Sequence, residues 1–325
     1  MNARIQCAAA YVPQRAVSND DLGKLVDTND EWITTRTGIK SRRISMGENT
    51  SDLGIQVARA LIAKSGLDAL DIDMILVATV TGDYATPSVA CLIQAAVGAH
   101  HAFCFDINAA CSGFLYGMSV AEKMIATGRC QNSIVIGAEV LSKMADWTDR
   151  ATCVLFGDGA GGVLLTAAAN GGILGENLYA DGRHSQAIHG GHRPVCNAYT
   201  EAQPDGKPSH LQMNGRELFD FTTREVPGSI QKLLADTQTD SSDIRWFLLH
   251  QANVRIVQAI AKKLKFDYER FYVNIGRFGN TSGATIPIAL SEMLDNGDLV
   301  IGSGEKIVLS AFGGGVTWGS MLIQI

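Results

Sequence analysis

Two patterns in the first half of the chain recur in the second half. Residues 71–77 (DIDMILV) and 243–249 (DIRWFLL) both predict a buried strand after an acidic start, and glycine-rich residues 156–164 resemble residues 312–319. Short apolar runs bounded by Gly, Asn and Asp alternate with amphipathic helical segments, which is typical of layered α/β proteins. The repetition therefore predicts a duplicated α/β fold.

The chain is long enough for two such halves around a large core. It has 325 residues, 46% of them apolar, and a chain of this size buries most of its surface on folding. We expect an N-terminal half, residues 1–169, and a C-terminal half, residues 170–325. Residues 170–216 are rich in Gly, His, Asn and Pro, which predicts long loops of the kind that often carry function.

Charge and cysteine content narrow the possible classes of protein. The net charge is −6, so nothing indicates a nucleic-acid binder that acts through bulk positive charge. The apolar runs are far shorter than the roughly 20 residues that a membrane span requires, and the N-terminus does not have the pattern of a signal peptide. Seven irregularly spaced cysteines favour a reducing compartment over a disulfide framework. We expect a cytoplasmic protein that binds neither membrane nor nucleic acid.

Cys111 is the first candidate for catalysis. It follows a strand-like run at 102–107 and a short turn, and it opens a helix predicted over 111–127. Backbone N–H groups and the helix dipole at such a position lower a thiol pKa and favour the thiolate. A thiolate placed there can attack a thioester. The alternative is a buried structural cysteine.

Two further polar side chains follow predicted strands in the second half. His250 ends the apolar run 246–249, and Asn280 lies between a strand predicted at 271–275 and an apolar helix-like run at 284–290. Ligands of α/β proteins commonly bind at such strand ends. A structural histidine and an ordinary turn asparagine remain the alternatives. Together with Cys111, these residues are expected to face one another across a cleft between the halves.

Several ordered motifs resemble one known family. They are residues 28–38 (TNDEWITTRTG), 110–114 (ACSGF), 156–161 (FGDGAG), 250–255 (HQANVR), 279–282 (GNTS) and 312–319 (FGGGVTWG). The chain resembles β-ketoacyl-acyl carrier protein synthase III, of the thiolase superfamily, over residues 4–322. The resemblance implies a thiolase-like fold, a duplicated five-layer αβαβα sandwich with mixed sheets, and a homodimer.

The resemblance also implies a mechanism. Cys111 would take an acyl group from acyl-CoA, and malonyl-acyl carrier protein would then lose carbon dioxide and attack the acyl-cysteine, initiating fatty acid biosynthesis. His250 and Asn280 would stabilise the enolate, while the N–H groups of Cys111 and Gly314 would form the oxyanion hole. No cofactor or metal is implied, because acyl-CoA is a substrate.

Binding residues are carried over from the same family. The implied CoA contacts are Thr28, Trp32, Arg36, Arg150, Gly215, Phe219 and Asn253. Arg255, Lys262 and Lys263 lie on a predicted amphipathic helix and would dock the carrier protein, unless they form an ordinary solvated face. The chain departs from the family at two positions. Asp220 replaces a common lysine, which puts docking in doubt, and Thr86 replaces a phenylalanine that closes the acyl pocket across the dimer, which predicts room for starters longer than acetyl.

Other functions are weighed against this one. The chain has no cysteine after Cys196 and no histidine after His250, unlike degradative thiolases and elongating ketosynthases respectively. A secondary-metabolism acyltransferase that acylates a non-carrier nucleophile stays open, as does a non-catalytic binding module. His184, His189, His192 and Cys196 could suggest a metal site, but their spacing contains no tight ligand pair. The starter, the carrier protein and any role of this histidine loop are left open.

Overall fold

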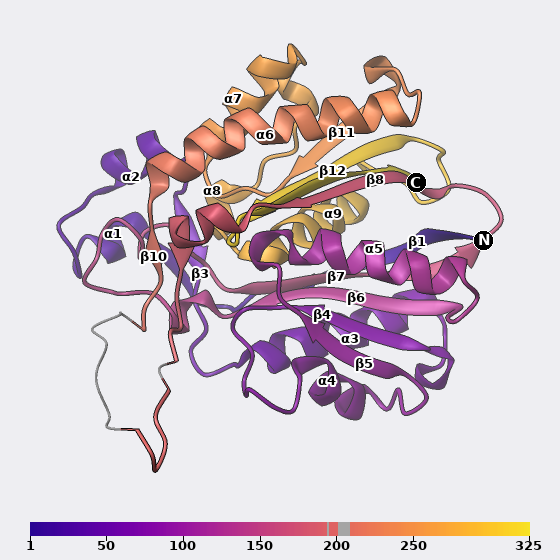
Figure 1. Cartoon of the computed structure of the whole chain (residues 1–325), viewed down its shortest axis with the longest axis horizontal. Helices are drawn as coiled ribbons and strands as arrows, with labels where there is room; N and C mark the ends of the chain where they lie inside the picture. Colours follow the sequence, from indigo (N-terminus) through magenta and orange to yellow (C-terminus); the bar gives the residue numbers. More distant parts are fainter. Residues whose placement is uncertain (194, 201–208) are drawn as a thin grey trace.

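The computed structural model describes residues 1–193, 195–200 and 209–325, and these form two mixed β-sheets separated and covered by helices (Figure 1). The first sheet has the order β1 (Asn2–Tyr11), β7 (Gly159–Ala168), β6 (Asn132–Glu139), β4 (Met74–Ala78) and β5 (Phe103–Ile107). β4 runs parallel to β5 and β6, whereas β7 is antiparallel to β6 and β1. The strands expected near 71–77 and 102–107 are therefore present.

The second sheet lies above the first in Figure 1. Its order is β11 (Ile244–Leu249), β12 (Lys306–Gly313), β13 (Thr317–Gln324) and β8 (Gly172–Ala180), with only β11 and β12 parallel. β11 and β12 both end at the active-site side of the molecule, where His250 follows β11. This sheet supplies the half of the site that lies opposite Cys111.

A strand expected at 271–275 does not form. Phe271 makes a single bridge to Phe247, and Ile275 already begins helix α8 (Ile275–Phe278). The backbone N–H groups of Asn274 and Ile275 both donate to Oε1 of Gln251, at 2.9 and 3.0 Å. Because a side chain satisfies these amides, they are not available for a strand ladder.

Helices occupy three layers around the two sheets (Figure 1). α5 (Gly113–Ala126) and α9 (Thr285–Asn296) lie between the sheets, and their apolar faces join strands of both sheets in one core. α3 (Thr50–Ser65) and α4 (Val89–Val97) cover the outer face of the first sheet. The outer face of the second is covered by α6 (Gly215–Asp236) and α7 (Val254–Leu264). This is the expected five-layer arrangement.

Shorter elements connect these layers. They are β2 (Ala16–Ser18), β3 (Ser41–Arg43), β9 (Ile188–His189), β10 (Gln212–Met213), α1 (Asn19–Leu22), α2 (Asp30–Thr37), and 3₁₀ turns η1 (Ala69–Asp71), η2 (Ala110–Ser112), η3 (Leu141–Lys143), η4 (Gly182–Ala187), η5 (Ser241–Asp243), η6 (Tyr268–Arg270) and η7 (Ser282–Ala284). No helix in the described ranges is long and apolar enough to cross a bilayer. Every strand of the first sheet precedes residue 169 and every strand of the second follows residue 171. Because α5 and α9 share one core, the division into two halves at 169/170 stays a prediction.

Turn η7, from the second half, packs directly against the first sheet. A Cβ atom added to Gly137 of β6 would overlap the backbone carbonyl of Gly283 in η7. The close approach of these two backbones therefore requires glycine at position 137.

This contact gives a stability prediction. Gly137→Ala should lower the free energy of unfolding by about 1–3 kcal/mol, as overpacking of a closed core typically does. Gly228→Ala is the matched control, because the same Cβ in the exposed part of α6 meets nothing within 4 Å; it should stabilise by about 0.5–1 kcal/mol. Urea unfolding of the three proteins measures both effects, and equal stability of Gly137→Ala and wild type would contradict the close packing.

Candidate active site

Cys111 lies in the 3₁₀ turn η2, two residues before α5 begins. The preceding residue, Ala110, has a φ of +46°, a conformation that non-glycine residues rarely adopt. The turn is held by Thr317, whose hydroxyl donates to the carbonyl of Ala109 at 3.0 Å and whose carbonyl accepts from the Ser112 hydroxyl at 3.0 Å. Thr317 begins β13, so the second half of the chain fixes the conformation around Cys111.

The glycines before β13 allow this hairpin to approach the cysteine. A Cβ on Gly313 would lie 2.6 Å from the backbone nitrogen of Cys111, and a Cβ on Gly314 would lie 3.5 Å from the Cβ of Ala110. Gly314 thus lies beside the turn that carries the nucleophile candidate.

His250 is buried at the end of β11. Its side chain lies edge-on to Phe312, with ring centroids 4.9 Å apart, and its backbone N–H donates to Ser310 at 2.8 Å. Burial lowers the pKa of the imidazole to about 3, so the ring is neutral near pH 7. Its Nδ1 atom is buried without a hydrogen-bond partner among the described residues, and buried polar atoms without partners are rare unless a ligand or water completes them.

Asn280 is anchored through its backbone to the first half. Its N–H donates to Leu155 at 2.8 Å, and its carbonyl accepts from Gly157 at 3.0 Å. Its side-chain oxygen accepts the N–H of Ser282 at 2.8 Å. Because the oxygen is used in this way, the amide is oriented and its NH₂ group is the end available to a substrate oxygen.

Ser282 connects the three expected catalytic residues. Its N–H donates to the side-chain oxygen of Asn280 at 2.8 Å. By hydrogen bonding, its side chain opposes the rise in the pKa of the Cys111 thiol, and its backbone opposes the fall in the pKa of His250. The hydroxyl also donates to Oε1 of Glu139 at 3.2 Å. The sequence reasoning did not single out Ser282 or Glu139. The sequence features that indicate them are weak: Ser282 lies inside the GNTS motif, and Glu139 directly follows an apolar run.

A cavity of about 990 Å³ opens at this point. Both halves contribute to its lining, which includes Cys111, Ser282, Gly314, Leu141 and Phe156. Cys111 is half-buried there. His250 and Asn280 are only 1% and 5% exposed, and they lie behind the lining residue Ser282. The volume suits a small-molecule or acyl-chain site.

The expected lowering of the Cys111 pKa is wrong for the free protein. Burial raises the pKa of the thiol to about 12, and the negative charge of Glu139 acts in the same direction, although hydrogen bonds from Ser282 and the backbone oppose them. Cys111 also precedes α5 (Gly113–Ala126) rather than opening it. Desolvation therefore outweighs the helix terminus, and the resting site holds a neutral thiol and a neutral imidazole.

The expected CoA contacts fall around Trp32. The guanidinium groups of Arg36 and Arg150 lie 4.6 and 5.4 Å from its ring centroid. The Thr28 hydroxyl oxygen is buried without a partner among the described residues, and Asn253 donates to the carbonyl of Arg36 at 2.9 Å.

The other two expected CoA positions belong to helix α6. Gly215 begins this helix, and Phe219 is exposed one turn later.

The expected docking residues are exposed on α7, as predicted from its amphipathic pattern. The buried face of the helix consists of Ile256, Val257, Ile260, Ala261 and Leu264. Arg255 donates to the carbonyl of Thr35 at 2.7 Å and Lys263 to that of Thr223 at 3.1 Å. Lys262 and Asp220 are also exposed. Thr86 is exposed and does not line the cavity of its own chain.

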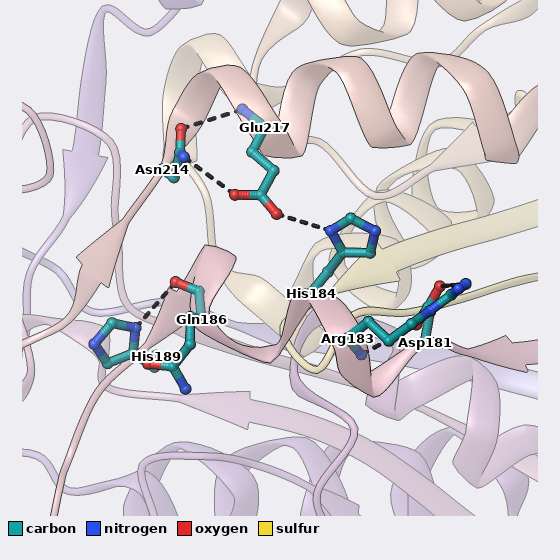
Figure 2. Close-up of polar contacts among 7 residues, drawn as sticks. All are labelled: Asp181, Arg183, His184, Gln186, His189, Asn214 and Glu217. Atoms are coloured by element: carbon teal, nitrogen blue, oxygen red, sulfur yellow. Dashed lines mark hydrogen bonds and ion pairs between the residues drawn. The ribbon is translucent and has the colours of Figure 1, made fainter.

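The loop histidines form separate contacts (Figure 2). His184 pairs through Nδ1 with Glu217 at 2.8 Å, while Nδ1 of His189 bonds the carbonyl of Gln186 at 3.2 Å. Within the described ranges no three His, Cys, Asp or Glu side chains are grouped to hold a metal ion. The considered site at His184, His189, His192 and Cys196 therefore gains no support, although His189 does line the cavity.

Comparison with known proteins places this geometry in context. Residues 105–182 match the family model described as 3-oxoacyl-[acyl-carrier-protein (ACP)] synthase III, and residues 234–325 match the model of its C-terminal part. The chain is 50% identical over 323 residues to a β-ketoacyl-[acyl-carrier-protein] synthase III of Enterococcus faecalis and 50% identical over 324 residues to that of Streptococcus mutans, with 99% of each chain covered. The crystal structure of the Aquifex aeolicus 3-oxoacyl-[acyl-carrier-protein] synthase III is similar with a TM-score of 0.92 and 40% identity, covering 99% of this chain and 100% of the other. These similarities confirm the expected thiolase-like fold class and do not favour the alternative acyltransferase.

The buried neutral imidazole gives a pH prediction. The folded pKa of His250, about 3, lies below its ordinary value of 6.5, so the unfolded chain binds a proton that the folded chain does not. His250 should therefore lower folding stability progressively as the pH falls below 6.5. Chemical denaturation of wild type and His250→Gln between about pH 5 and 8 measures how the free energy of unfolding of each protein depends on pH.

The wild type should lose stability relative to His250→Gln on acidification. Because Glu139 is present in both proteins, its own titration largely cancels in the difference. A difference that stays constant across the range would contradict a buried neutral His250.

Proposed function

This chain belongs to the β-ketoacyl-[acyl-carrier-protein] synthase III family of condensing acyltransferases, which initiate fatty acid biosynthesis, and we propose that Cys111 is the nucleophile of its reaction. The observation that carries the proposal is the position of Ser282, which lines the cavity with Cys111, donates to Asn280, and influences the pKa of both Cys111 and His250. A thiol, an imidazole and a carboxamide brought together in this way suit acyl transfer followed by carbanion stabilisation.

In the first half-reaction, the sulfur of Cys111 attacks the thioester carbonyl of an acyl-CoA. The carbon–sulfur bond to CoA breaks, CoA leaves with the thiol proton, and an acyl-cysteine remains. The N–H groups of Cys111 and Gly314 are proposed to bind the oxyanion that develops on the carbonyl oxygen. Loss of one such donor typically costs roughly 2.7–4 kcal/mol of transition-state stabilisation.

In the second half-reaction, malonyl-acyl carrier protein loses carbon dioxide and leaves an enolate. The neutral imidazole of His250 and the NH₂ group of Asn280 would donate hydrogen bonds to the enolate oxygen. The carbanion then attacks the acyl-cysteine carbonyl, the carbon–sulfur bond to Cys111 breaks, and the 3-ketoacyl product is released. The departing thiolate takes a proton from solvent, which regenerates the Cys111 thiol. A neutral imidazole can donate one hydrogen bond without bringing a charge into the buried site, which fits the burial of His250.

Acyl-CoA binding is proposed along the set of residues expected from the family. The partly exposed indole of Trp32, with Arg36 and Arg150 near its ring, would flank the adenine, because purines stack well on indole and guanidinium planes. Thr28, Asn253, Gly215 and Phe219 would follow the pantetheine arm. The Thr28 hydroxyl, which is buried without a partner among the described residues, would hydrogen-bond the ligand. The acyl-CoA is a substrate, so the proposed reaction requires no separate cofactor.

Carrier-protein docking is proposed on α7. Arg255, Lys262 and Lys263 present positive charge on its exposed side, which complements an acidic partner and speeds encounter. Asp220, exposed on neighbouring α6, adds one negative charge to this surface, so we expect docking to rely on the α7 residues.

A homodimer is also proposed. β5 is the edge strand of the first sheet, and its five residues are all half-buried in the single chain. Edge strands of this kind are normally covered or paired. Thr86 would then extend toward the partner's cavity, where its small side chain leaves room for long or branched starters. All seven cysteines are free, which is consistent with the proposed cytoplasmic location.

The experiment that tests this function is intact mass spectrometry after incubation with a panel of acyl-CoAs, followed by peptide mapping. We expect an acyl adduct on Cys111, with starters longer than acetyl accepted. Cys111→Ser should form no stable thioester adduct, whereas Cys91→Ser, a half-buried cysteine outside the site, should be acylated like wild type. An adduct that maps to another cysteine would contradict the proposed nucleophile, and priming by acetyl-CoA alone would contradict the roomier pocket.

Replacement of His250 by Ala tests the assignment of roles. Because His250 is proposed to act on the malonyl thioester, His250→Ala should reduce release of carbon dioxide from malonyl-acyl carrier protein far more than it reduces acylation of Cys111, by at least about tenfold. Cys111→Gln, which lacks the nucleophile, should retain decarboxylation. If His250→Ala loses acylation yet still decarboxylates, the assigned roles are reversed.

A further inference from the structure

Glu139 is a buried carboxyl group that the proposed reaction does not use. It ends β6 and is 0% exposed. Its oxygens accept hydrogen bonds from the N–H of Val80 at 3.2 Å and from the hydroxyls of Thr79 at 3.2 Å and Thr81 at 2.5 Å. A buried carboxyl needs such donors to remain ionised, so this environment can hold the charged form without a paired cation.

Glu139 lies one hydroxyl group away from the proposed nucleophile. The hydroxyl of Ser282 donates to Oε1 of Glu139 at 3.2 Å. Ser282 lines the same cavity as Cys111, and its side chain acts to lower the pKa of the Cys111 thiol by hydrogen bonding, against the larger effect of burial. Ser282 holds this position with a φ of +51°, which is rare for a residue other than glycine. The geometry therefore places a single hydroxyl between a carboxyl group and a sulfur atom.

A serine hydroxyl has only one proton to donate. An ionised Glu139 can only accept hydrogen bonds, so it takes the Ser282 proton and leaves a lone pair of that oxygen facing the thiol. A neutral Glu139 carries its own proton, which frees the Ser282 hydroxyl to donate to the sulfur. A hydrogen bond donated to sulfur stabilises the thiolate.

We propose that Glu139 is a positioning residue which, through the Ser282 hydroxyl, determines whether the site favours the thiol or the thiolate form of Cys111. The inference rests on the proposed function, in which Cys111 is the nucleophile. A neutral Glu139 makes Cys111 more reactive, and an ionised Glu139 restrains it.

The charge of Glu139 also disfavours the thiolate form of Cys111 directly. Burial raises the pKa of Glu139 to about 7, so both of its forms are populated near neutrality. Its negative charge raises the pKa of Cys111. The nearest cation is that of Lys143, which follows from its interaction with Glu139, Asp83 and Asp158 together, while His250 meets the network through Ser282 and is neutral.

The test is the pH dependence of Cys111 alkylation by iodoacetamide, followed by intact mass and peptide mapping. Glu139→Gln keeps the shape of the side chain, removes the charge, and supplies an NH₂ group that can donate to Ser282. We expect the midpoint of its rate profile to move to lower pH by about one unit, which is roughly a tenfold faster reaction below the midpoint.

Two further variants isolate the path through the hydroxyl. Ser282→Ala removes the hydroxyl whose lone pair an ionised Glu139 turns toward the sulfur, so its midpoint should move to lower pH, but by less than that of Glu139→Gln because the Glu139 charge remains. This variant also keeps the inference testable if Glu139→Gln does not fold. Asp158→Asn is the matched control, because Asp158 is equally buried and accepts hydrogen bonds from Ser45 and Ser142 but has none from Ser282. Its midpoint should equal that of wild type.

A wild-type midpoint for Glu139→Gln would overturn the inference, and so would a rate that falls equally at every pH, because a purely structural role predicts that result. Wild-type enzyme alkylated at Cys111 distinguishes this failure from a failure of the proposed function. If the alkylated enzyme still transfers acyl groups, the proposed function is wrong. If alkylation blocks transfer while Glu139→Gln keeps the wild-type midpoint, only the role of Glu139 is wrong.

Discussion

The backbone pairing between the turn at Asn280 and the segment at 155–157 is the contact on which the site depends. Asn280 donates to Leu155 and accepts from Gly157, and this isolated bridge ties a turn of the second half to a strand end of the first. Gly137 lets the following turn approach β6 until their backbones touch. Because backbone hydrogen bonds in a buried position are costly to break, the carboxamide of Asn280 and the hydroxyl of Ser282 are held in fixed positions beside Cys111.

The resting site carries little charge, and this follows from its burial. The pKa of Cys111 is raised to about 12 and that of His250 is lowered to about 3, so both groups are neutral near pH 7. In the proposed reaction, charges develop on reacting oxygen atoms during each half-reaction, where oriented N–H groups would meet them at little reorganisation cost. Glu139 is the exception, since its pKa of about 7 lets it change charge near neutrality. In the proposed arrangement, Glu139 would adjust the reactivity of Cys111 without touching the substrate.

Much of the fold and part of the site could be predicted because local sequence specifies them. The apolar runs before residues 78 and 250 became β4 and β11, and the position of Cys111, His250 and Asn280 after strands indicated a shared edge. The strand predicted at 271–275 failed because a distant side chain, Gln251, binds its amides. Ser282 and Glu139 are separated by 143 residues, and no local pattern indicates such a contact. The pKa of Cys111 was predicted in the wrong direction, because helix position is visible in sequence whereas burial is decided by tertiary packing.

The most direct test of the account is a crystal structure of the enzyme after reaction with an acyl-CoA. The account predicts electron density for an acyl group on the sulfur of Cys111, with its chain in the 990 Å³ cavity. The thioester oxygen should lie within hydrogen-bond distance of the N–H groups of both Cys111 and Gly314. An acyl group attached elsewhere, or a thioester oxygen directed away from these two N–H groups, would contradict it.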